Sequence, residues 1–375
     1  MREKRMLKRI AAFLRREVVF TASLAAALLS MLLTAPGLHT LADIDTATLF
    51  MLFGLMTTVA GLRRIGLFDR LGSAMTARLR SVRALGVTLV CVCFVLAMAA
   101  TNDVALITLV PFTLLLMRGA RSKDVILTVV LETIAANLGS MFTPIGNPQN
   151  LYLYSSGRLS IGDFPLLTWP YALVSLAALV ALCLLLPQSL VGRLDAEKKP
   201  IPRRGLMLYG AMTAVALLGV AKVLPPWALA AVVLALAALF DREVLREVDF
   251  TLLGTFVCFF VFVSGVKGYA PVSAALEGMM ASQPLLVPLA VSQVISNVPA
   301  CLLLAPFTQD AGALMLGVNL GGLGTLVASL ASLISYKLYA AAEGAEKGRY
   351  FKVFTVLNVA LLALLLALAC LLGAL

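Results

Sequence analysis

Charged residues are scarce in this sequence: Lys, Arg, Asp and Glu together make up 13% of its 375 residues. A soluble globular domain carries about 25% charged residues and about 45–50% apolar ones. Here 61% of the residues are hydrophobic, which is more apolar surface than a core of this size can hide from water. The composition therefore indicates a protein embedded in a lipid bilayer.

Residues that build metal centres and disulfides are also few. His39 is the only histidine, and one histidine cannot form a metal site. All six cysteines lie within apolar segments, where cysteine behaves as a small hydrophobic residue. Nucleophile elbows, zinc-protease motifs and phosphate-binding loops are missing. We therefore expect no enzyme activity, no cofactor and no metal other than a coupling Na⁺.

The net charge of +11 invites a nucleic-acid partner, but the positions of the basic residues argue against one. Nearly all of them lie between apolar segments, as the positive-inside rule describes for membrane proteins. The expected partners are the lipid bilayer and a small anionic or metalloid solute, with no nucleic acid.

Long apolar segments predict an all-α polytopic fold with about nine membrane spans. The spans are expected near residues 18–34, 44–62, 124–157, 166–186, 206–222, 226–240, 249–266, 313–340 and 352–373. Two further apolar stretches, 84–117 and 284–307, are interrupted by the polar tips Thr101-Asn102-Asp103 and Ser296-Asn297. We expect each to form a re-entrant helical hairpin that enters and leaves the membrane on one side.

The basic residues support these hairpins. With a cytoplasmic N-terminus and each hairpin counted as no crossing, all of the 30 Lys and Arg residues except Arg158, Lys222 and Lys267 fall on the cytoplasmic side. A full crossing by either stretch would invert the later loops and destroy this bias. The sequence thus predicts an inner (plasma) membrane protein with a cytoplasmic N-terminus and an external C-terminus.

The two halves of the chain repeat one order of features. The paired positions are Asp45 and Asp249, Gly61 and Gly265, Asn102 and Asn297, Asn137 and Asn319, and Thr143 and Thr325. By the charge count, the two hairpins enter from opposite sides, which is an inverted-topology repeat typical of secondary transporters. The predicted organisation is a basic segment with the first helix (1–40), the first repeat (41–187), a cytoplasmic linker with two bridging spans (188–248) and the second repeat (249–375).

Each half also contains a membrane segment that should be unwound. Residues 138–150 include two prolines and two glycines, and residues 320–332 include three glycines. Non-helical backbone at membrane depth is tolerated where it is buried in protein or lines a cavity. Freed carbonyls and polar side chains there offer oxygen ligands to Na⁺, and half-helix N-termini suit an anion. The candidate binding residues at the tips and unwound segments are Thr101, Asn102, Asp103, Asn137, Ser140, Thr143, Asn147, Ser296, Asn297, Asn319 and Thr325.

Two carboxylates, Asp103 and Glu132, fall at membrane depth and are candidates for ion coupling. Plainer interpretations exist for both: Asp103 as a helix N-cap and Glu132 as a hydrogen-bonded packing residue. Small residues such as Gly317 and Gly321 also serve close helix packing. Four polar interruptions paired by a repeat favour a binding site.

Three strings, TNDVALITLVPFTLLL, ANLGSMFTPIGNPQNLYLY and SQVISNVPACLLLAPFT, resemble the citrate-transporter-like permeases of the ion transporter superfamily. That group includes divalent anion–sodium symporters and arsenite permeases. The resemblance implies that the two tips bind substrate carboxylate and Na⁺, and that the protein moves like an elevator, commonly as a homodimer. The tips depart from the group's Ser-Asn-Thr pattern, because Asp103 and Val298 replace hydroxyl residues.

The sequence therefore predicts a Na⁺- or H⁺-coupled secondary transporter of a small anion, such as a di- or tricarboxylate. Its site would lie at the membrane midplane, between the hairpin tips and the unwound helices. The alternatives are an arsenite or antimonite efflux permease and a Na⁺/H⁺ antiporter.

Overall fold

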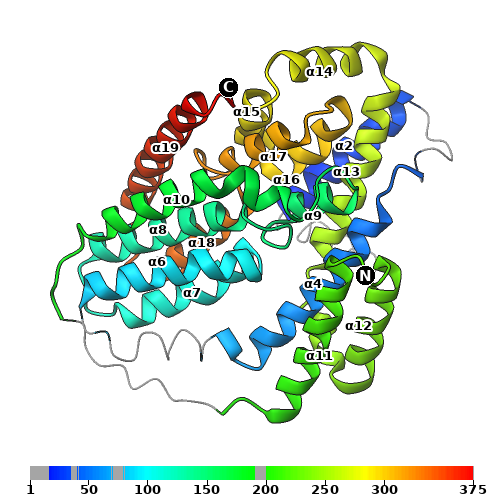
Figure 1. The fold of residues 1–375 in the computed structure, drawn as a ribbon. Coiled ribbons are helices and arrows are strands. Elements are labelled where there is room, and N and C mark those ends of the chain that lie inside the picture. The colour runs from blue at the N-terminus through cyan, green and yellow to red at the C-terminus, as the bar shows by residue number, and fades with distance from the viewer. Residues whose placement is uncertain are drawn as a thin grey trace, which may run out of the picture.

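The computed structural model describes residues 17–34, 40, 42–68, 70, 79, 81–190 and 200–374. His39 and the basic residues between positions 2 and 16 lie outside the described residues, as does much of the predicted linker. Within the described ranges the protein is built from helices and has no β-strand, apart from an isolated bridge between Ser81 and Leu190. The all-α prediction is confirmed (Figure 1).

The first half of the chain forms seven described helices. They are α2 (Val18–Thr34), α4 (Thr46–Arg64), α6 (Val82–Ala99), α7 (Asn102–Leu116), α8 (Ser122–Ser140), α9 (Pro148–Ser155) and α10 (Asp163–Cys183). The bridging region holds α11 (Arg203–Val220), α12 (Pro226–Phe240) and the short 3₁₀ helix η1 (Arg242–Arg246). The rest comprises α13 (Phe250–Gly268), α14 (Ala270–Ser282), α15 (Leu286–Ile295), α16 (Asn297–Leu304), η2 (Ala305–Phe307), α17 (Ala311–Leu320), α18 (Leu330–Ala340) and α19 (Lys347–Leu371).

Five of the described helices are long and apolar enough to cross a membrane: α4, α6, α10, α13 and α19. Helix α6 is among them, although the sequence assigns it to a hairpin arm. Shorter apolar helices include α7, α12 and α15 to α17. The multi-pass character is therefore clear from the helices, while the count of nine spans and the re-entry of the hairpins stay predictions.

Both membrane segments that were expected to unwind are interrupted. The first break (residues 141–147) separates α8 from α9, and the second break (residues 321–329) separates α17 from α18. Pro148 occupies the first turn of α9, where its missing N–H leaves no helical bond unmade. In the second break, Gly324 adopts a φ of 104°, which side chains other than glycine rarely accept.

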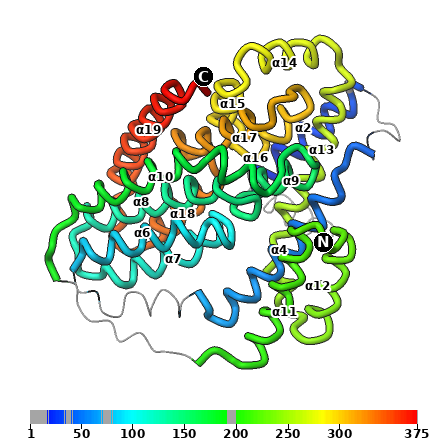
Figure 2. Tube along the Cα trace, in the orientation of Figure 1, coloured from blue at the N-terminus to red at the C-terminus, as the bar shows by residue number. Residues whose placement is uncertain are grey.

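The helices form two packed groups joined in the middle. Helices α6, α7 and α10 pack on α8, and α11 and α12 pack on α4 (Figure 1). Helices α9, α16 and α17 contact one another between the two groups, as the trace in Figure 2 shows. Helix α8 lies at the centre of the first group and is buried along nearly its whole length. The break that follows it is therefore held inside the protein.

Glycine lets the hairpin arms approach the broken helices closely in both halves. A Cβ on Gly139 of α8 would lie 2.2 Å from the backbone oxygen of Phe94 on α6. A Cβ on Gly321 would lie 2.9 Å from the Cα of Leu289 on α15. Gly321 therefore has the packing role that the sequence allows. This role is compatible with a binding role for the second break.

Helix α14 is an element that the sequence does not predict. It follows α13 directly, carries Pro271 in its first turn and is exposed along most of its length. Its composition is mixed rather than continuously apolar, so it gives no spanning signal. In Figure 1 it lies at the edge of the molecule, away from the two breaks.

Candidate functional site

The first tip (residues 101–103) joins α6 to α7. The Thr101 hydroxyl accepts a hydrogen bond from the Val104 N–H at 3.3 Å and caps α7. Asp103 therefore lies in the first turn of α7 and is not the cap that one interpretation of the sequence expects. Asn102 is buried, and its backbone N–H donates to the Gly146 carbonyl at 3.0 Å. The tip is thereby tied to the first break.

The second tip (residues 296–298) joins α15 to α16 in the same way. The Asn297 N–H donates to the Ala328 carbonyl at 2.9 Å, which ties this tip to the second break. Ser296 has a φ of 75°, a strained value for a residue with a side chain. Its hydroxyl donates to the Ala328 carbonyl at 3.4 Å. Val298 is buried and adds no polar group to the tip.

A threonine in each break repeats the same pair of hydrogen bonds. Thr143 Oγ1 donates to the Met98 carbonyl at 2.5 Å and accepts from the Gly146 N–H at 3.1 Å. Thr325 Oγ1 donates to the Gln293 carbonyl at 3.1 Å and accepts from the Ala328 N–H at 3.2 Å. Each carbonyl belongs to the helix arm that leads to the tip, so each threonine fastens a break to its own hairpin.

Asn137 connects the first half to the second. Its amide donates to the Ser332 hydroxyl at 3.2 Å and its oxygen accepts from the Ser329 hydroxyl at 2.9 Å. The same oxygen accepts from the Asn102 amide at 3.3 Å. Ser140, one turn later in α8, donates to the Asn137 carbonyl at 2.8 Å. One buried amide thus contacts the first tip and the second break.

Asn319 makes the reciprocal connection. Its amide donates to Asn150 Oδ1 at 2.8 Å, and its oxygen accepts from the Gln149 amide at 3.2 Å. Asn150 also donates to the Ser140 and Thr143 carbonyls, at 3.1 and 3.2 Å. Each half therefore places the asparagine of its first half-helix against the second half-helix of the other half.

Five residues of this network are absent from the candidates that the sequence supplies. They are Gln149, Asn150, Gln293, Ser329 and Ser332. The repeat could have revealed three of them. Asn150 and Ser332 stand at the same spacing after Asn137 and Asn319, and Ser329 stands at the position equivalent to the candidate Asn147. Gln293 gave no comparable signal. The equivalent residue of the first half is Met98, whose hydrogen bond to Thr143 is made by its backbone carbonyl.

The remaining predicted residues take different places. Asn147 is buried at the start of α9, but its side chain does not cap that helix. Thr325 and Val327 are exposed, whereas the second break is buried at residues 321–324 and 328–329. Among the tip and break residues named here, Asp103 alone carries a charge. The site is otherwise made of amides, hydroxyls and freed carbonyls, which suit a cation or a hydrogen-bonding solute.

Glu132 lies apart from this network, on the buried face where α8 meets α7. Its Oε1 accepts from the Thr113 hydroxyl at 2.5 Å, and its backbone oxygen accepts from the Cys93 thiol at 3.3 Å. Its Oε2 is fully buried and has no hydrogen-bond partner among the described residues. The described residues also offer it no ion pair and no acidic, cysteine or histidine cluster able to hold a metal.

The sequence of this chain is similar to those of known membrane transporters. A sequence model described as citrate transporter matches residues 9–319. Inner membrane protein YbiR of Escherichia coli (strain K12) is 35% identical over 301 residues, which cover 77% of this chain and 78% of the relative. An uncharacterized transporter of Methanocaldococcus jannaschii is 28% identical over 76% of this chain and 79% of its own. The silicon efflux transporter LSI3 of Oryza sativa subsp. japonica is 35% identical over a shorter stretch, 38% of this chain and 30% of that protein.

Proposed function

This chain belongs to the citrate transporter family, and we propose that it is a Na⁺- or H⁺-coupled secondary transporter of a small anion such as a di- or tricarboxylate. The family and the relatives are named as transporters rather than enzymes, so membrane transport of a small solute is the shared activity. One bacterial relative is named as an inner membrane protein, which favours the inner membrane as the location of this chain.

The observation that carries this proposal is the exchange of asparagines between the two halves. Asn137 and Asn319 are both buried, and each bonds across to the second half-helix of the opposite half, at Ser332 of α18 and Asn150 of α9. Two breaks at membrane depth that meet in this way create one polar centre surrounded by apolar helices. A protein that only needed to fold would gain nothing from two such interruptions, because buried polar groups are costly unless they are satisfied.

We further propose that the two helix pairs, α6–α7 and α15–α16, are re-entrant hairpins of opposite orientation. The matched bonds of Thr143 and Thr325 support a common origin for the two halves. The distribution of basic residues supports opposite entry sides. An elevator movement and a homodimer, which the family resemblance implies, are compatible extensions of this arrangement.

The chemistry of the centre favours an anion that travels with a cation. Amide and carbonyl oxygens, such as those around Asn102 and Asn297, are the ligands that Na⁺ accepts. Bound Na⁺ would offset both the charge of Asp103 and that of a carboxylate. The amide N–H groups and the N-termini of α7 and α16 then remain for the anion itself.

Glu132 is the proposed proton-carrying group, with Asp103 as the alternative. A fully buried carboxyl with one free oxygen and no ion pair is best accommodated in its neutral, protonated form. If Glu132 couples transport to H⁺, it must gain and lose that proton as α8 is exposed to each side. Asp103, at the tip, would instead act on the bound cation.

A second candidate function is efflux of a neutral metalloid hydroxide. The observation that favours it is the absence of Lys, Arg or His among the tip and break residues named above, together with the anionic Asp103. One relative carries the name of a silicon efflux transporter. A neutral hydroxide needs only hydrogen bonds, which the amides and hydroxyls of this centre supply.

A flux assay in proteoliposomes tests these proposals. Citrate, succinate, arsenite and Na⁺ are offered in turn under imposed Na⁺ and H⁺ gradients. We expect carboxylate uptake that an inward Na⁺ or H⁺ gradient stimulates and that Asn102→Ala and Asn297→Ala abolish. Arsenite flux without carboxylate flux would favour the second candidate. Unchanged flux in both asparagine variants would overturn the site.

The same assay distinguishes Glu132 from Asp103 as the proton-carrying residue. Glu132→Gln keeps an acceptor for the Thr113 hydroxyl while removing the exchangeable proton. We expect its flux to lose the response to a pH gradient and to keep any response to Na⁺. An unchanged pH response would exclude Glu132 and leave Asp103 for the Asp103→Asn variant to test.

A further inference from the structure

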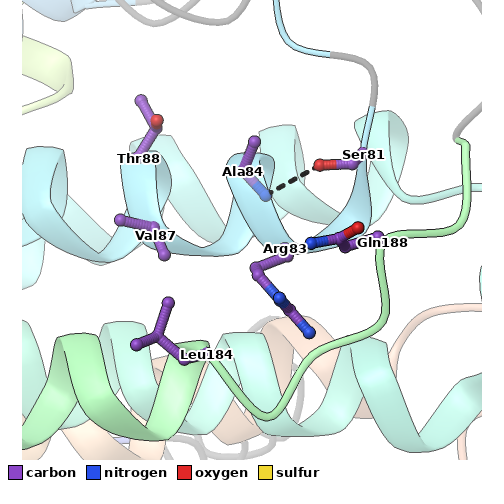
Figure 3. A pocket seen from close by; sticks show the side chains of 7 residues that line it. All are labelled: Ser81, Arg83, Ala84, Val87, Thr88, Leu184 and Gln188. Carbon is purple, nitrogen blue, oxygen red and sulfur yellow. Dashed lines mark hydrogen bonds between the residues drawn. The ribbon is translucent and has the colours of Figure 1, made fainter.

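A groove lies far from the two breaks, where the start of α6 meets the chain that leaves α10. Figure 3 shows the residues that line it: Ser81, Arg83, Ala84, Val87, Thr88, Leu184 and Gln188. Its volume is about 520 Å³ and it is open on one side. Nothing in the transport proposal uses it, and its residues are not part of the tip and break network.

Backbone contacts fix the two walls of this groove. The N–H groups of Val82 and Arg83 donate to the carbonyls of Ser189 and Pro187, both at 3.0 Å. Gly86 allows the Leu186 side chain to lie directly on α6, because a Cβ there would be 2.3 Å from it. The groove is therefore a built feature of the fold rather than a gap between loosely placed loops.

The Arg83 guanidinium forms the polar end of the groove. Its Nε donates to the Leu186 carbonyl at 2.8 Å, which fixes the plane of the group. Its two terminal nitrogens have no partner among the described residues, and none of the described residues that line the groove is a carboxylate. In Figure 3 the side chain extends from α6 toward the loop that leaves α10 and carries Gln188. A fixed guanidinium with two free donors suits a phosphate group.

The other end of the groove is apolar and continues onto an exposed apolar surface. Ala84, Val87 and Leu184 line it, and the neighbouring Leu185 is 73% exposed. Helix α6 rises about 5 Å per turn, so Val87 lies about one turn deeper than Arg83. The groove thus presents a cation at one level and hydrocarbon at the next, which matches the order of groups in a phospholipid.

We propose that this groove binds an anionic phospholipid, with its phosphate on Arg83 and an acyl chain along Val87 and Leu184. The basic residues of the predicted cytoplasmic segments place this end of α6 on the leaflet whose anionic lipids attract such residues. A soluble phosphate would use Arg83 but not the apolar end of the groove. The lipid would hold the ends of α6 and α10 together. This proposal does not depend on the cargo or on the coupling ion.

Native mass spectrometry of the detergent-solubilised protein with added phosphatidylglycerol tests the proposal. We expect the wild-type protein to retain the lipid and to bind phosphatidylcholine several-fold more weakly. Arg83→Gln should lower the affinity for phosphatidylglycerol about tenfold, because a charge-assisted bidentate contact is lost. Arg83→Lys should lie between them. Phosphatidylglycerol should also raise the melting temperature of the wild-type protein and leave that of Arg83→Gln unchanged.

The matched control is Arg203→Gln, because Arg203 is exposed at the start of α11 and does not line the groove. This variant should bind phosphatidylglycerol as the wild type does. Equal binding by Arg83→Gln, or equal binding of phosphatidylcholine by the wild type, would overturn the proposal. Displacement of the lipid by millimolar inorganic phosphate would mean that Arg83 binds a soluble anion instead. The lipid comparison on the wild type remains decisive if Arg83→Gln fails to fold.

Discussion

The two halves of the molecule use one hydrogen-bonding plan with different side chains. Each has a buried asparagine at its tip, a threonine that fastens the break, and an asparagine that bonds to the second half-helix of the other half. The difference lies in what surrounds this plan. In the first half, α9 contributes the amides of Gln149 and Asn150, whereas in the second half Ser329 of the break and Ser332 of α18 contribute hydroxyls.

The tips differ as well. Asp103 of the first tip corresponds to Val298 of the second, and the strained Ser296 corresponds to Thr101, whose backbone is extended. The hydrogen bonds common to both halves therefore fix the position of the site, and the residues that differ between the halves, such as Asp103 and Val298, set its charge. We infer that selectivity rests mainly on the first half, so substitutions at paired positions should have unequal effects.

The largest effect is expected where a glycine contacts another helix. Gly139→Ala places a Cβ 2.2 Å from the Phe94 carbonyl, where only backbone movement can relieve the clash. We expect a loss of about 3 kcal/mol or a failure to fold, since overpacking at a rigid contact costs about 1–3 kcal/mol or more. Gly321→Ala should lose less. Thermal unfolding in detergent measures both.

The control is Gly278→Ala on the exposed helix α14, where a Cβ would meet nothing within 4 Å. Alanine is a better helix former by about 1 kcal/mol, so this variant should be as stable as the wild type or more so. Equal stability of Gly139→Ala and the wild type would show that α6 and α8 are not in such close contact.

The next effect is expected at the two connecting asparagines. Asn137→Ala removes partners from Asn102, Ser329 and Ser332, and should cost about 2–4 kcal/mol because these buried groups lose their bonds together. Asn319→Ala should cost somewhat less. A double-mutant cycle between Asn137→Ala and Ser332→Ala should show coupling, whereas one between Asn137→Ala and Asn150→Ala should show less.

The charge difference between the tips predicts an asymmetric effect on transport. Asp103→Asn should weaken the dependence of flux on the coupling cation, because it removes the charge that a bound cation would offset. Val298→Thr, at the paired position, should change flux only about twofold, since it adds a hydroxyl without a charge. Initial rates of transport, measured as a function of Na⁺ concentration, compare the two variants. Similar cation dependence in both variants would contradict the inferred asymmetry.

The smallest effect is expected at the threonines. Thr143→Val removes a partly buried bond to the Met98 carbonyl and should cost about 1–2 kcal/mol. Thr325→Val, at an exposed position, should cost about 0.5–1 kcal/mol. Melting temperatures of the pair resolve the difference. A larger loss at Thr325 would show that exposure does not set the order.

Much of this site follows from the sequence because membrane burial makes polar residues conspicuous. Asn102, Asn137, Asn297 and Asn319 stand out against apolar neighbours, and all four are buried where the halves meet. Glycines in both breaks, and prolines at the first, stand out for the same reason, since they interrupt helices whose backbone must otherwise be satisfied internally.

Other features depend on three-dimensional contacts that spacing does not encode. The φ of Ser296 follows from how α15 and α16 join, and serine carries no signal for it. Gln293 enters the site because α15 lies beside the second break, where its amide donates to the Gly321 and Leu323 carbonyls. Glu132 is fully buried, but its partners on α6 and α7 place it away from the breaks.

Opposite orientation of the two tips is the central claim of this account, and cysteine labelling tests it most directly. Arg118→Cys and Gln309→Cys are exposed positions that follow the first and second helix pairs. Each is made in a Cys370→Ser background, because Cys370 is itself exposed. With a membrane-impermeant maleimide on intact cells, Gln309→Cys should be labelled at once and Arg118→Cys only after permeabilisation. Labelling of both positions from the same side would contradict the account.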